Sequence, residues 1–275
     1  MVAPAPLTRH VVDGLGVQRR RPAEVDPRRP AIVLVHGAMD RAASFGRVMR
    51  RLGDIDVCAY DRRGYATSLG AGVSGTLDEQ AADLLAIISW VGTATVVVVG
   101  HSFGGTVALQ LAGADPDGLV GLGAFESPVP SLSTYRSDGA DLALAADDAA
   151  GPEAAAEAFY RLMVGDVVWD RLREEDRAIR RAEGSQLVAE LRALRRSPDL
   201  PRLGAVGVHV VVGAGSASHP AWHRSAEDLA GQLPSATYVE IVGAGHGAHL
   251  SHPDEFARYV RSCAATDVAV RANPS

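Results

Sequence analysis

A serine and a histidine in glycine-rich segments are the residues best suited to nucleophilic catalysis. Ser102 is the centre of Gly-His-Ser-Phe-Gly at 100–104, which follows a run of four valines and precedes a stretch of small residues. A GxSxG segment between a strand and a helix exposes its serine on a sharp turn, and the glycines let strand and helix approach closely. A serine hydroxyl needs a base to take its proton. His246, in the Gly-Ala-Gly-His segment that follows the last predicted strand, is the candidate base.

Backbone N–H groups beside Ser102 predict an oxyanion hole. Ala38 follows a predicted strand in a His-Gly-Ala turn, and Phe103 directly follows the serine. Their N–H groups can point at the charge that develops on a carbonyl oxygen under attack. We expect His36 to hold the loop rather than to move protons. His249 and His252 are interpreted as surface histidines, because no carboxylate or cysteine near them in the sequence completes a metal site.

Short apolar runs that alternate with segments of helical period must position these residues. This pattern predicts an α/β fold with a mostly parallel sheet and helices on both faces. The predicted strands are a hairpin of 8–12 and 15–20 around Asp13-Gly14, followed by 31–35, 55–60, 95–99, 119–125, 206–212 and 237–242. The predicted packing helices are 77–90, opened by a Thr76 to Glu79 capping box, then 104–112, 222–231 and 253–263.

A long segment between two of the predicted strands contains no strand-like run. Its stretches 141–148, 152–163, 169–181 and 185–195 are predicted helices. An insertion of this length is too large for a connecting loop, which indicates a helical cap. The predicted domains are therefore a core of 1–128 and 204–265, a helical cap of 129–203, and a flexible tail of 266–275.

Four segments together resemble the α/β-hydrolase superfamily. They are HGAMD at 36–40, YDRRGYATS at 60–68, GHSFGG at 100–105 and GAGHGAHLSHPDEF at 243–256. The resemblance covers almost the whole chain in order, and it implies an eight-stranded, mostly parallel sheet with a helical lid.

The sequence departs from this family at the position of the acid. Most members place it after the strand that is here 206–212, yet no Asp or Glu occurs between Leu203 and Ala226, and Ser216 cannot stabilise an imidazolium. Some members place it at the end of the preceding strand, where this chain has Glu126. We therefore predict Glu126 as the acid. Asp61 is the competitor, although it resembles the family's structural Asp and is expected to pair with Arg62 or Arg63.

The resemblance implies a cofactor-free serine hydrolase that acts through an acyl-enzyme on a small or medium apolar ester or lactone. A Glu at 126 after its strand, together with SHPDEFARYV at 251–260, is similar to zearalenone lactone hydrolases, which favours a lactone. The FESP segment at 125–128 also resembles a group of bacterial hydrolases. A C–C bond hydrolase with the same triad and a ligand-binding protein on this scaffold remain alternatives. Members with Asp in place of the serine, the haloalkane dehalogenases and epoxide hydrolases, are disfavoured. The candidate substrate contacts, which can equally be cap core, are Met39, Phe159, Tyr160, Met163 and Trp169.

The composition limits the partners. Lys and Arg number 27, all of them Arg, against 33 acidic residues, for a net charge of −6. This balance disfavours nucleic acid, which selects a positive face. Cys58 and Cys263 stand alone, and no window approaches the roughly 18 apolar residues of a membrane span. We expect a cytoplasmic protein with a small-molecule substrate, no membrane partner, no metal or other cofactor, and activity that survives EDTA; a homo-oligomer is left open.

Overall fold

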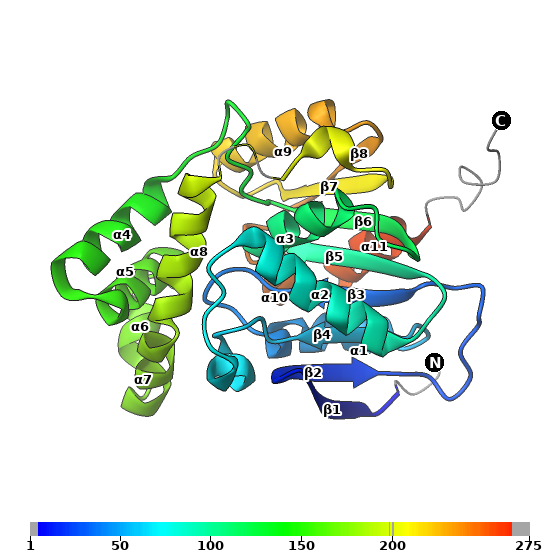
Figure 1. Cartoon of the computed structure of the whole chain (residues 1–275), viewed down its shortest axis with the longest axis horizontal. Coiled ribbons are helices and arrows are strands. Elements are labelled where there is room, and N and C mark those ends of the chain that lie inside the picture. The colour runs from blue at the N-terminus through cyan, green and yellow to red at the C-terminus, as the bar shows by residue number, and fades with distance from the viewer. Residues whose placement is uncertain (1–4, 198, 200, 266–275) are drawn as a thin grey trace.

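One eight-stranded sheet runs through the molecule (Figure 1). The computed structural model describes residues 5–197, 199 and 201–265, so the predicted tail of 266–275 lies outside the described residues. The strands, in the spatial order β1-β2-β4-β3-β5-β6-β7-β8, are β1 (Leu7–Val12), β2 (Leu15–Arg20), β3 (Ala31–Val35), β4 (Val57–Tyr60), β5 (Val96–His101), β6 (Leu119–Phe125), β7 (Val210–Gly215) and β8 (Ala236–Ile241). Strands β3 to β8 run parallel, and β1 and β2 pair antiparallel at one edge. The predicted sheet is therefore confirmed.

Helices cover both faces of the sheet and create two apolar cores. One face packs against α2 (Leu77–Val91), α3 (Phe103–Ala112) and α9 (Pro220–Gln232). The other packs against α1 (Gly46–Arg51), α10 (Ala248–Ser251) and α11 (Pro253–Ala264). Short 3-10 turns occur at Ala42–Phe45, Ala66–Ala71 and Leu203–Ala205. The predicted capping box opens α2, since the side chains of Thr76 and Glu79 each accept from the other's backbone N–H.

Among the described residues between β6 and β7, five helices gather beyond the carboxyl ends of the parallel strands (Figure 1). We call this group the helical cap: α4 (Asp138–Ala150), α5 (Pro152–Val164), α6 (Asp166–Arg171), α7 (Glu174–Ala182) and α8 (Gly184–Arg196). The prediction of one helix over 169–181 is wrong, because Leu172 and Arg173 have extended backbone that separates α6 from α7. The division of the chain into domains stays a prediction.

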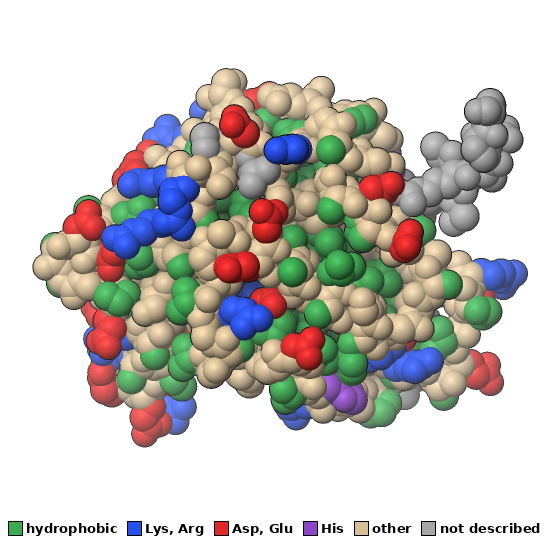
Figure 2. All heavy atoms as spheres, in the orientation of Figure 1, with side chains coloured by type: hydrophobic (Ala, Val, Ile, Leu, Met, Phe, Trp, Pro, Cys, Tyr) green, Lys and Arg blue, Asp and Glu red, His purple; other side chains and the backbone are tan. Residues whose placement is uncertain are grey.

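Charged side chains of both signs alternate on the surface of the cap. Figure 2 shows acidic and basic groups side by side there, and Arg192 and Arg195 of α8 pair with Asp147 and Asp141 of α4. Among the described helices, none combines the length and apolar character that crossing a membrane requires.

Candidate active site

Ser102 sits on a strained turn between β5 and α3. Its backbone has φ 52° and ψ −129°, a region that residues with side chains rarely adopt. Glycines make the turn sterically feasible: a Cβ on Gly104 would lie 2.2 Å from the carbonyl oxygen of Val35, and one on Gly100 would lie 2.3 Å from the backbone nitrogen of Gly105. Strained backbone of this kind persists where the surroundings enforce it and is typical of functional sites.

Glu126 and His246 are in direct contact. The Nδ1 atom of His246 lies 2.6 Å from Oε2 of Glu126, and the other carboxylate oxygen accepts the N–H of Gly215 at 2.8 Å. Strand pairing explains the placement, since His101 of β5 is opposite Phe125 of β6, which brings Ser102 and Glu126 to the same edge. The predicted contact is therefore present. Because Glu126 occupies Nδ1, Nε2 remains as the nitrogen that can take a proton from a nucleophile.

Ser102 and His246 line one cavity, but the described residues show no hydrogen bond between their side chains. Catalytic hydrogen bonds are often long without substrate and shorten in the complex. The competitor Asp61 makes no hydrogen bond with His246 among the described residues. Its carboxylate accepts the backbone N–H groups of Ala42 and Thr67, together with the Thr67 hydroxyl.

The loop after β3 carries Ala38, one of the two predicted oxyanion donors, and is held by His36; Phe103, the other, is the first residue of α3. Ala38 and Phe103 both line the cavity beside Ser102. His36 is fully buried; its Nδ1 lies 2.7 Å from the carbonyl oxygen of Gly37, and its Nε2 accepts the N–H of Arg62 at 2.8 Å. Burial, reinforced by the charge of Arg62, lowers the pKa of His36 to about 4. His36 is therefore a neutral structural residue, as expected.

Comparison with known proteins agrees with the fold described above. The model of the alpha/beta hydrolase family matches residues 32–259, which is most of the chain. The chain belongs to the alpha/beta hydrolase family.

Several relatives of this alpha/beta hydrolase carry named activities. The lipase LipV of Mycobacterium tuberculosis is 36% identical over 133 residues, which cover 48% of this chain and 51% of LipV, so the chain spans about half the length of that relative in the match. A Variovorax paradoxus protein named "Putative carbamate hydrolase RutD" is 29% identical over 211 residues, 74% of this chain and 78% of that one. The solved enol-lactonase from Burkholderia xenovorans LB400 superposes with a TM-score of 0.68 at 21% identity, over 93% of this chain and 98% of that chain.

Arg62 joins the cap of this alpha/beta hydrolase to the loop after β3. The prediction that Asp61 pairs with Arg62 or Arg63 is wrong: Arg63 binds Asp83, while Arg62 forms a buried ion pair with Glu190 of α8. Arg62 also donates to the carbonyl oxygens of His36 at 2.9 Å and Gly37 at 3.0 Å. One guanidinium therefore binds both the cap and the loop that carries Ala38.

The cavity above Ser102 has a volume of about 530 Å³ and lies between the cap and the sheet. Helices α5 and α8 contribute apolar side chains to its lining, namely Phe159, Leu162, Met163, Leu191 and Leu194. Phe159 and Met163 are thus where the sequence analysis expects substrate contacts. Met39, Tyr160 and Trp169 are not among the described residues that line the cavity, and their contact with substrate stays a prediction. Met39 belongs to a buried apolar cluster, Trp169 is fully buried, and Tyr160 packs against Trp169 and Arg180.

Sequence reasoning missed two features around His246. Trp222 at the start of α9 stacks on its ring, with centroids 4.8 Å apart and an interplanar angle of 21°, and also lines the cavity. In the sequence, the local indication of a role for Trp222 is its position shortly after β7. The interpretation of His249 as a surface residue is also wrong, because His249 is buried and its Nε2 lies 3.1 Å from Oδ2 of Asp40.

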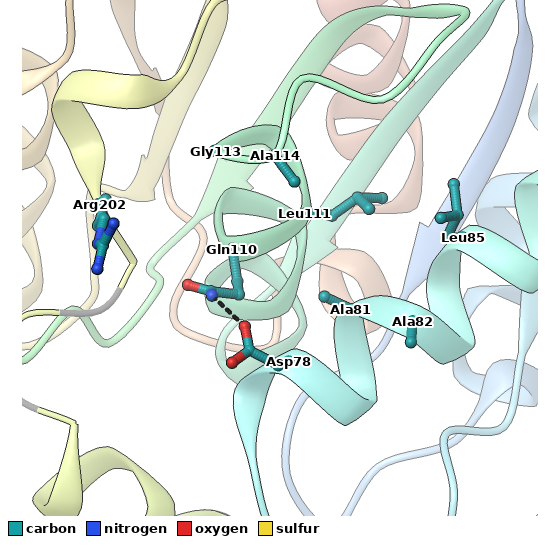
Figure 3. A pocket seen from close by; sticks show the side chains of 9 residues that line it. All are labelled: Asp78, Ala81, Ala82, Leu85, Gln110, Leu111, Gly113, Ala114 and Arg202. Carbon is teal, nitrogen blue, oxygen red and sulfur yellow. Dashed lines mark hydrogen bonds between the residues drawn. The ribbon is translucent and has the colours of Figure 1, made fainter.

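A second hollow, of about 470 Å³, lies between α2 and α3 (Figure 3). Gln110 donates to Asp78 across it, and Leu85 and Leu111 contribute apolar walls. The described residues that line it include no serine, cysteine or histidine. This hollow therefore lacks the groups that the first cavity brings together.

Proposed function

We propose that the protein is a serine hydrolase in which Ser102, His246 and Glu126 form the catalytic triad. The observation that carries the proposal is the 2.6 Å contact between His246 and a buried Glu126, next to a serine on a strained turn in the same cavity. A nucleophile, a base and a group that orients the base are the elements that acyl transfer requires.

The chemistry follows from the placement of these groups. The Ser102 hydroxyl attacks the substrate carbonyl while Nε2 of His246 takes its proton. Glu126 holds the imidazole by Nδ1 and stabilises the imidazolium that forms. The N–H groups of Ala38 and Phe103 donate to the oxyanion. His246 then protonates the leaving oxygen, and a water molecule, deprotonated by the same histidine, releases the acid from Ser102.

The cavity supports a proposal for the substrate class. A volume of about 530 Å³ suits a small or medium-sized molecule, and the leucine, methionine and phenylalanine side chains favour an apolar acyl group. We propose a carboxylic ester or lactone. The lipase name of LipV supports ester chemistry.

Covalent labelling tests the proposal. A fluorophosphonate should phosphonylate Ser102 Oγ with loss of fluoride, and peptide mass spectrometry should locate the adduct there. Ser102→Ala should remove the label, and His246→Ala should slow labelling strongly because the hydroxyl loses its base. A serine that stays unlabelled in the folded wild-type protein, or a label on another residue, would overturn the assignment.

A further inference from the structure

A cluster of two histidines and one aspartate lies near Ser102 and His246 but does not line the cavity that these two residues share. Asp40, His101 and His249 each place one potential ligand atom within 4.8 Å of the others. His101 and His249 are 5% and 2% exposed, and their ring centroids are 4.3 Å apart. We propose that this cluster is a structural binding site for a divalent transition-metal ion, with Zn²⁺ as the best fit.

The donor types match such an ion, and so does the separation of the His249 and Asp40 ligand atoms. Two imidazoles and a carboxylate suit zinc and its neighbours rather than magnesium or calcium, which prefer oxygen ligands. Ligands bound at roughly 2.0–2.1 Å from one tetrahedral ion lie about 3.3 Å apart. The 3.1 Å between Nε2 of His249 and Oδ2 of Asp40 is close to that separation. Zinc would replace the proton that these two atoms share, and binding would release it to solvent.

His101 independently supports the metal site, because one of its ring nitrogens has no hydrogen-bond partner among the described residues. Its Nε2 lies 2.7 Å from the carbonyl oxygen of His246, the kind of contact through which a metal-binding histidine fixes its tautomer. Its Nδ1 is buried and has no hydrogen-bond partner among the described residues. A buried ring nitrogen normally finds a partner, and a metal ion would provide one.

Solvent can reach the cluster from outside. The Asp40 side chain is 22% exposed, and its Oδ2 accepts the hydroxyl of Ser44 at 3.0 Å. Ser44 and Leu250, the sequence neighbour of His249, line a surface hollow of about 370 Å³ together with Arg47 and Arg50. A water molecule from this side would complete a four-coordinate site.

The location assigns the ion a structural role. None of the three ligands is among the described residues that line the cavity. Each ligand is close in sequence to a catalytic component, since Asp40 follows the loop of Ala38, His101 precedes Ser102, and His249 follows His246. A bound ion would hold these three segments together without contacting substrate.

Zinc binding to the full chain, freed of any affinity tag and stripped with EDTA, tests the proposal. We expect one Zn²⁺ per chain by equilibrium dialysis and elemental analysis, with a thermal midpoint several degrees higher. Asp40→Asn and His249→Gln should each lower the affinity for zinc at least tenfold. These variants retain polar side chains of similar size, and circular dichroism would verify their fold before titration.

His252→Ala is the matched control, because His252 is close to His249 but does not belong to the cluster. It should bind zinc as the wild type does. A wild-type chain that takes up no zinc would overturn the proposal. So would equal uptake by the wild type and both ligand variants, which would indicate adventitious binding to other histidines.

Discussion

Glu126 reaches His246 from a backbone conformation that most residues avoid. Its φ is 45°, in the left-handed region, which costs a residue with a side chain about 1–3 kcal/mol. Both carboxylate oxygens have partners, Gly215 on β7 and His246, and the residue is 1% exposed. The carboxylate therefore has little freedom, and the imidazole of His246 has one orientation imposed on it.

Replacing Glu126 by Gln should abolish most turnover while leaving the fold intact. The amide cannot stabilise an imidazolium and can hold the ring in the wrong tautomer, a change that costs roughly 10⁴ in kcat in triads of this kind. Steady-state kinetics with a chromogenic ester would measure the loss. Asp61→Asn is the control, and it should lower the thermal midpoint with little effect on kcat because Asp61 braces the segments of Ala42 and Thr67. A wild-type kcat in the Glu126→Gln variant would show that Glu126 is not a member of the triad.

His36 should make the folded state sensitive to acid. Its Nε2 accepts the N–H of Arg62, so a proton on that nitrogen would set two donors against each other. With a folded pKa of about 4 and an unfolded pKa of 6.5, the unfolded chain binds the proton first as the pH falls. Stability is therefore lost from about pH 6.5 downwards and levels off below about pH 4, a total of about 3 kcal/mol.

Urea unfolding of the wild type and of His36→Gln between pH 7 and pH 4 would measure this effect. The Gln variant should be less stable at pH 7 and should lose less free energy of unfolding as the pH falls. Parallel pH profiles for the two proteins would show that His36 is not the titrating group.

At the scale of elements, the ion pair between Arg62 and Glu190 couples α8 to the loop after β3. Glu190→Gln would leave the buried guanidinium without a counter-charge, and we expect a loss of about 3–5 kcal/mol in the free energy of unfolding. The kcat of the folded variant should also fall, because Arg62 holds the carbonyls beside Ala38. Arg195→Ala, which breaks the exposed pair with Asp141 between α8 and α4, should cost less than about 1 kcal/mol. Equal losses in urea titrations would contradict the coupling.

The sequence predicts elements that have local signals and misses pairings that do not. The hairpin follows from Asp13-Gly14, where both residues have positive φ, and α2 follows from its capping box. The break before α7 has no glycine or proline to mark it, since Leu172 and Arg173 adopt extended backbone within an otherwise helical pattern.

Contacts between distant segments explain the other errors. Arg62 and Glu190 are 128 positions apart, and His249 and Asp40 are 209 positions apart. Neither pairing has a local signature. The prediction of Glu126 as the acid rests on the family resemblance together with a parallel strand order, which places the ends of β5 and β6 next to each other.

At the scale of the whole molecule, the cavity between cap and sheet should set the preference for acyl chain length. Met163→Trp would add bulk to the cap side of the cavity, and kcat/KM for long-chain esters should fall roughly tenfold. Acetate esters should be affected little, because their acyl group stays near Ser102. Leu85→Trp is the control, since Leu85 lines the other hollow and is similarly exposed, at 41% against 46% for Met163. A series of p-nitrophenyl esters would reveal the selectivity, and equal losses for short and long chains would contradict it.

The insertion of the cap between β6 and β7 also bears on how the chain folds. Leu122 and Val210 are neighbours in the sheet although roughly 90 positions separate them. Each doubling of loop length costs only about 0.6 kcal/mol in closure entropy, so the long insertion burdens the final stability little. The insertion should instead lower the rate of folding. β7 can pair with β6 only after the long unfolded segment between them has brought the two strands together. The edge of β6 is unpaired until then, and crowded refolding mixtures should lose material to aggregation through that edge.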